Sequence, residues 1–169
     1  SPKDVEPTNI VLNKNIKYTS VGGYYTLTAR LYPNNVTKTD VKWTLSDESI
    51  ASIEKISSRQ VKVHFNKSGV VMVTATDESG HQDRCFFIIK DEPTMSKEEV
   101  SLKVGKSTTL KFVNKYSWAE VSVESSNPDV AVATEKGKIT AKGKGTATIT
   151  WKIDQCGKVY TAKVKVTVQ

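Results

Sequence analysis

Short segments in which apolar and polar residues alternate fill the sequence, and turn-forming residues separate them. Alternation with a period of two places successive side chains on opposite faces of a β-strand, whereas helical periodicity is nearly absent here. Regularly spaced short strands are typical of a β-sandwich or barrel. The pattern predicts strands near residues 10–12, 25–32, 41–45, 50–56, 60–65, 69–77 and 83–90, and again near 100–104, 107–113, 119–124, 130–134, 138–141, 145–153 and 159–168.

The second half of the chain repeats the first. Residue types match at a separation that falls from 83 to 76 positions, as in Val21-Gly22 with Val104-Gly105, and Gly69 with Gly145. The falling separation indicates that loops shorten in the second copy while strand order is kept. A polar stretch with a proline, Asp91 to Met95, follows the last strand of the first copy. We therefore expect an all-β chain with two domains of about seven strands each, residues 1–91 and 92–169.

Short motifs recur in both copies. Those in the first copy are Val21-Gly22, Leu27-Thr28-Ala29, Val41-Lys42-Trp43, Ser46-Asp47 and Ile50-Ala51. Those in the second copy are Val104-Gly105, Ser125-Ser126-Asn127, Val130-Ala131, Gly137-Lys138-Ile139-Thr140-Ala141 and Gly145-Thr146-Ala147-Thr148-Ile149. Together they resemble the group 2 bacterial Ig-like domains, which occur in tandem on surface proteins of the intimin and invasin type. The resemblance covers nearly the whole chain and implies two tandem Ig-like β-sandwich domains.

The two copies differ in where they place a large core aromatic residue. Val123 occupies the position in the second copy that Trp43 occupies in the first, while Trp151 lies one strand later. We expect Trp151 to fill a comparable volume of core from the neighbouring strand. Phe65, Phe87 and Phe112 are also expected in the cores, because each lies on an alternating segment.

The net charge of +7 raises the question of a nucleic-acid partner, because basic patches bind polyanions. Residues 1–91 have a net charge of +2 and residues 92–169 a net charge of +5. In the second half, lysines alternate with valines, as in Lys163-Val164-Lys165-Val166, which is typical of a solvated sheet face. The lysine cluster at 136–144 contains no aromatic residues for stacking bases. The distribution therefore predicts no nucleic-acid partner.

Residues suited to catalysis or metal binding are few. Each predicted domain holds one cysteine, Cys85 or Cys156, so neither can form an internal disulfide, and we interpret both as small apolar side chains. His64 and His81 are expected at the surface. The sequence lacks a nucleophile elbow, a phosphate-binding glycine loop and the spaced ligands of a metal site. We expect no enzyme activity, no cofactor and no metal.

Two aromatic residues, Tyr116 and Trp118, lie in a polar stretch where alternation does not place both in a core. Loop aromatics of this kind stack on sugar rings or anchor protein partners. The alternative is that one or both fold back over the end of the sandwich. Tyr116 and Trp118 are therefore the candidate ligand-binding residues.

The function expected from these observations is a stalk or spacer module of a bacterial cell-surface or secreted protein. The alternative is an adhesin module that binds a carbohydrate or a host protein through the loop aromatics. The expected partners are neighbouring domains of the same polypeptide and, for the adhesin, a cell-surface glycan or protein. The chain begins at Ser1 without an initiator methionine, so we expect a fragment whose membrane anchor, if it has one, lies outside it.

Overall fold

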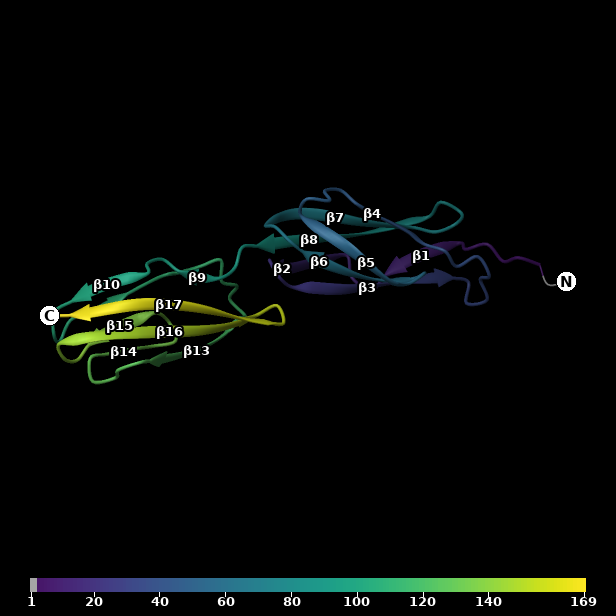
Figure 1. The fold of residues 1–169 in the computed structure, drawn as a ribbon. Coiled ribbons are helices and arrows are strands. Elements are labelled where there is room, and N and C mark those ends of the chain that lie inside the picture. The colour runs from purple at the N-terminus through teal and green to yellow at the C-terminus, as the bar shows by residue number, and fades with distance from the viewer. Residues whose placement is uncertain (1–2) are drawn as a thin grey trace. The chain divides into compact units, whose positions relative to one another are not determined.

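The structure is a computed structural model that describes residues 3–169, and in this range it is all-β (Figure 1). The chain forms two compact units, one ending at Asp91 and the other covering Glu92–Gln169. Each unit contains its own hydrophobic core. The all-β, Ig-like fold class is therefore confirmed, although the strands number eight in the first unit and nine in the second.

The first unit packs two four-stranded sheets face to face, with strand orders β1-β3-β6-β5 and β2-β8-β7-β4. Its strands are β1 (Asn9–Leu12), β2 (Ile16–Ser20), β3 (Tyr24–Tyr32), β4 (Lys42–Leu45), β5 (Ala51–Ser57), β6 (Gln60–Phe65), β7 (Gly69–Thr76) and β8 (Gln82–Lys90). All neighbours are antiparallel except β2 and β8, which run parallel. Alternate residues of each sheet fill the core between them, including Leu27, Val63, Phe65 and Phe87.

The second unit has a four-stranded sheet in the order β10-β17-β16-β13, a three-stranded sheet β11-β15-β14 and a short pair β12-β9. Its strands are β9 (Thr94–Met95), β10 (Glu99–Leu102), β11 (Ser107–Thr109), β12 (Phe112–Val113), β13 (Glu120–Ser125), β14 (Ala131–Ala133), β15 (Lys138–Ala141), β16 (Gly145–Gln155) and β17 (Lys158–Val168). Here too the first and last strands of the large sheet, β10 and β17, run parallel.

Three strand predictions need correction. β2 and β9 were not predicted, and the single strand predicted at 107–113 is two strands. The chain changes partner between them, because β11 pairs with β15 whereas β12 pairs with β9. Leu110 lies at the change of partner, buried, with its amide donating to the carbonyl oxygen of Gly137 at 2.9 Å.

The expected relocation of the core tryptophan is confirmed. Trp43 pairs with Ala75 across β4 and β7, and at the equivalent place Val123 pairs with Trp151 across β13 and β16. The large and small side chains have exchanged strands, which conserves the volume of the cross-strand pair. The indole NH of Trp151 donates to the carbonyl oxygen of Thr134 at 2.9 Å, whereas that of Trp43 is buried and has no hydrogen-bond partner in the described residues.

Cys85 and Cys156 form no disulfide in the described part of the chain. Cys85 is fully buried in the core of the first unit. This burial, together with the nearby Asp83 carboxylate, raises the pKa of the Cys85 thiol to about 11. A neutral, buried thiol is a poor nucleophile, so Cys85 contributes packing. Cys156 lies in the turn between β16 and β17, at a φ of 55°.

Because each unit has its own core, residues 1–91 and 92–169 should fold independently when expressed separately. Each half should give a dispersed amide NMR spectrum that overlays the matching part of the spectrum of the whole chain. A half that stays unfolded alone, while the joined chain folds, would contradict this expectation.

The two tryptophans should respond differently to removal of the indole NH. Trp151→Phe should destabilise the second unit by about 0.5–1.5 kcal/mol, because it removes the hydrogen bond from the indole NH to the Thr134 carbonyl oxygen, which keeps only the Gly137 amide as a donor. Trp43→Phe should cost the first unit less, because it removes an NH that has no acceptor. Urea unfolding of each variant, followed by NMR of its own unit, measures the difference. Equal costs would show that the two indoles sit in equivalent environments.

Candidate functional site

The turn that follows β12 holds the two candidate aromatic residues of the second unit. Its conformation is fixed by Gln155, a buried residue at the end of β16. The Gln155 side chain accepts a hydrogen bond from the amide of Tyr116 at 2.7 Å and donates one to the carbonyl oxygen of Asn114 at 3.1 Å. Asn114 adopts a left-handed φ of 62°, which asparagine tolerates better than most residues. One buried amide therefore fixes the path of the turn.

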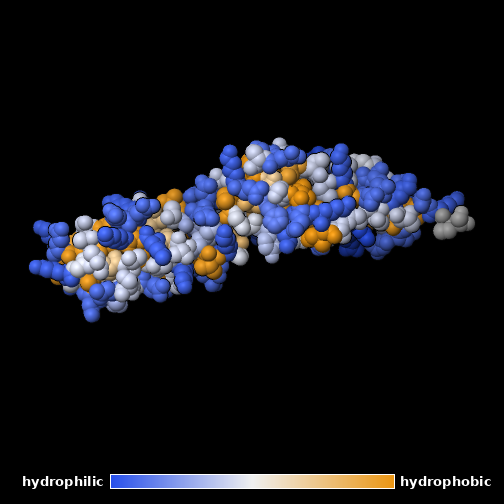
Figure 2. Space-filling view, in the orientation of Figure 1, coloured by the Kyte–Doolittle hydropathy of each residue, from blue (hydrophilic) through white to orange (hydrophobic). Residues whose placement is uncertain are grey.

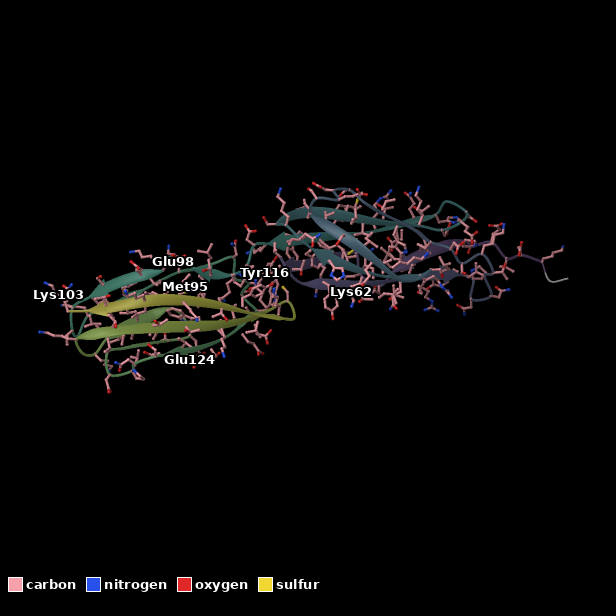
Figure 3. All side chains as sticks on the ribbon, in the orientation of Figure 1. Lys62, Met95, Glu98, Lys103, Tyr116 and Glu124 are labelled. Atoms are coloured by element: carbon pink, nitrogen blue, oxygen red, sulfur yellow. The ribbon has the colours of Figure 1, made fainter. Side chains whose placement is uncertain are left out.

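The structure places the two candidates differently, although it brings their rings together. Tyr116 (labelled in Figure 3) is 5% exposed, whereas Trp118 is 57% exposed. Their rings stack with centroids 4.4 Å apart and planes inclined by 11°. A hydrogen bond of 3.2 Å from the Ala119 amide to the Tyr116 carbonyl oxygen closes the turn around Trp118. Tyr116 thus supports the ring of Trp118, and Trp118 presents the accessible aromatic surface.

A groove of about 330 Å³ lies in the same unit, lined by Phe112, Lys115, Ala119, Val121, Glu135 and Lys136. The Lys115 ammonium group lies 5.4 Å from the centre of the Phe112 ring and donates to the carbonyl oxygen of Tyr116 at 3.2 Å. The groove therefore combines apolar walls with both signs of charge.

Gln155 was not singled out from the sequence, although a signal was present. Alternate residues of β16 point into the core, and those before Gln155 are Ala147, Ile149, Trp151 and Ile153. A polar residue that continues such a series must find hydrogen-bond partners inside the protein. A glutamine at an inward position thus indicates a side chain that organises a neighbouring loop.

The first unit has a larger opening at the edge between β4 and β5, where its two sheets do not meet. This cleft of about 550 Å³ is lined by Trp43, Thr44, Leu45, Glu48, Ala51, Ser52 and Ile53. Figure 2 shows hydrophobic surface in this region, between the positions that Figure 1 labels β4 and β5. Trp43, which lines the cleft, is partly buried and packs against the core of the first unit.

The titratable residues considered for chemistry have structural roles or lie at the surface. The Asp77 carboxylate is buried and accepts the amides of Ser79 and His81, each at 2.9 Å, while Nδ1 of His81 lies 3.0 Å from it. This arrangement fixes the turn between β7 and β8. Nε2 of His64 lies 3.3 Å from Glu54 Oε2, and both side chains are exposed.

Within residues 3–169, no group of three or more His, Cys, Asp or Glu side chains is placed to hold a metal ion. Nor does the described part of the chain contain a helix long and apolar enough to cross a membrane.

Solved structures with a similar fold include a C-terminal fragment of intimin, determined in complex with the intimin-binding domain of the translocated intimin receptor. It shares 17% identity with this chain and has a TM-score of 0.58, over 98% of this chain and 65% of the intimin fragment. The S-layer protein SbsC shares 18% identity with a TM-score of 0.38, over 99% of this chain and 28% of that protein. The chain thus spans less than two thirds of either structure. No curated protein matches it significantly in sequence.

The family model of the bacterial Ig-like domain (group 2) matches the chain twice, at residues 6–86 and 91–164. These matches cover most of the chain, and the fold of each unit agrees with them. The chain therefore belongs to the family of group 2 bacterial Ig-like domains, of which it contains two in tandem.

Proposed function

We propose that this chain is a non-catalytic stalk or spacer module of a bacterial cell-surface or secreted protein. The observation that carries the proposal is the parallel pairing of the first and last strands of one sheet in each unit, β2 with β8 and β10 with β17. A module that spans distance between other domains is pulled at its two ends. The way in which its terminal strands pair decides how it resists that force.

Parallel pairing suits this task for a geometrical reason. When the chain is pulled at its ends, β2 is pulled towards the N-terminus and β8 towards the C-terminus. Because the two strands are parallel neighbours, the force slides them past each other in opposite directions along the strand axis. All the hydrogen bonds between them, including Val21 N to Lys90 O at 2.9 Å, are then loaded together rather than one after another. The second unit repeats the arrangement, with Val104 N to Gln169 O at 3.1 Å. Family membership in two tandem copies supports the same proposal.

The second candidate function is that of an adhesin module, and the stacked Trp118 favours it. An indole supported by a second ring on a hydrogen-bonded turn loses little conformational freedom on binding. Such rigid aromatic anchors are typical of interaction hot spots. The intimin fragment, which shares the fold, was determined with a protein receptor, so a protein or a surface glycan is the class of ligand that we propose here.

Val21→Pro should lower the force at which the first unit unfolds when the chain is pulled at its ends, because it removes the hydrogen bond to Lys90. Forced unfolding follows the unfolding rate, so a lost load-bearing bond shows directly. Single-molecule pulling of the 169-residue chain should give one event per unit, with only one of them weakened. Val21→Ala, which keeps the amide NH, is the control. An unchanged force in the proline variant would argue against the stalk function.

If the chain binds a glycan or surface protein, Trp118→Ala should weaken binding roughly thirtyfold, the effect of losing a ~2 kcal/mol hot spot. Glycan arrays and panels of surface proteins supply the ligand, and isothermal titration supplies the affinity. The Lys163→Glu, Lys165→Glu double variant should bind normally and keep its affinity at raised salt. Binding that ignores Trp118 and is lost with the lysines would point instead to nonspecific attraction to polyanions.

A further inference from the structure

The outward face of the sheet β2-β8-β7-β4 in the first unit is apolar. Ile16, Tyr18, Val70 and Phe86 on this face are 45–58% exposed, and Met72 and Ile88 lie between them, partly buried. Strand register makes the six residues neighbours, because Phe86 pairs with both Ile16 and Met72, and Ile88 pairs with both Tyr18 and Val70. We call these six residues the outer patch. It is continuous across three strands.

The second unit provides an internal comparison for the outer patch. Val21 N donates to Lys90 O, and Val104 N donates to Gln169 O. Because these two hydrogen bonds are equivalent, each residue of the sheet in one unit can be matched to a residue of the other. At the positions of the outer patch the second unit has Glu99, Ser101, Thr146, Thr148, Lys165 and Thr167. The pair Ile16–Phe86 corresponds to the pair Glu99–Lys165.

The comparison separates what the fold requires from what it does not. The equivalent sheet of the second unit, in the same family and the same chain, is folded with polar residues at all six matched positions. Six apolar residues at these positions therefore do not serve the fold, and exposed apolar patches carry a risk of aggregation. Continuous exposed apolar surface on a soluble domain marks a place where another surface packs.

The charges on this face indicate the chemistry of the partner. Lys42, Arg84 and Lys90 are the charged residues at outward positions of the four strands, and no aspartate or glutamate stands at such a position. Arg84 donates to the side-chain oxygen of Gln82 at 2.7 Å, which is a neutral acceptor. At the outward positions of these four strands the charged residues are therefore all cations.

This charge distribution argues against a second copy of the same face as the partner. A twofold dimer would place the outward-facing cations of this sheet against one another, which is unfavourable. The six side chains are also too few for the ~800 Å² that each partner buries in a stable complex. We infer that the outer patch is a docking surface for a partner protein that presents apolar side chains bordered by carboxylates, and that binds weakly and reversibly.

The inference is tested with the ¹⁵N-labelled 169-residue chain and two synthetic β-hairpin peptides. One peptide presents leucines flanked by glutamates, and the other has lysine at every glutamate position. The first should shift the amide signals of residues 16–18, 70–72 and 84–88, and it should bind at least about tenfold more tightly than the second, which corresponds to ~1.4 kcal/mol.

The variant Ile16→Glu, Phe86→Lys gives the first unit the pair that the second unit already has at Glu99–Lys165. It should bind the acidic peptide at least about tenfold more weakly, with no large change in melting temperature. Val70→Thr, which matches Thr146, is a milder variant that should also weaken binding. Ser101→Glu, Thr167→Lys makes a similar change on the second unit, and should leave affinity unchanged.

Equal binding of the two peptides, shifts that cluster elsewhere or unchanged affinity in the Ile16→Glu, Phe86→Lys variant would overturn the inference. A dimer in sedimentation velocity that this variant abolishes would also overturn it, because the occupant would then be a second copy.

Discussion

The structure depends most on the parallel pairing of the first and last strands of one four-stranded sheet in each unit. Without it, β2 and β10 would detach from the edges of the sheets that they complete, because each pairs with no other strand of its sheet. The pairing joins residues far apart in sequence, such as Val21 and Lys90, and so closes each sandwich into a cooperative unit. Two glycines in the left-handed region, Gly22 at a φ of 89° and Gly105 at 82°, let the chain turn out of this pairing into the next strand.

The same pairing contributes to both the stalk function that we propose for the chain and the outer patch that we propose as a docking surface on the first unit. In each unit it joins a strand near the start of the unit to the last strand, which suits a stalk under tension. It also sets Ile16 and Tyr18 beside Phe86 and Ile88, which extends the outer patch from two strands to three. The Trp118 turn is independent of it, because its position depends on Gln155 at the other end of a long hairpin.

Alternation in the sequence was enough to predict most strands, because most of them have an apolar face towards a core and a polar face towards water. It missed β2 for a physical reason. In this strand Ile16 and Tyr18 point outward, while Lys17 and Thr19 point inward, so the usual relation between apolar character and burial is inverted. The Lys17 ammonium group lies 5.3 Å from the centre of the Tyr25 ring, which gives an inward lysine a favourable contact.

The candidate site was predicted in part. The sequence identified Tyr116 and Trp118 as unusual but could not assign one to the interior, because that depends on a hydrogen bond from residue 116 to residue 155. The outer patch was visible only as the apolar run from Cys85 to Ile89, which reads as a strand buried on both faces. Only the strand register shows that one of those faces is exposed.

Native-state hydrogen exchange measures the central constraint most directly. The amides of Val21 and Phe86 in the first unit, and of Lys165 and Gln169 in the second, donate at or beside the parallel pairing. They should exchange only through global unfolding, with the free energy obtained from the denaturant unfolding of their own unit. Exchange of these amides through local opening, at a much lower free energy than that of the core strands, would show that the pairing does not hold the units closed.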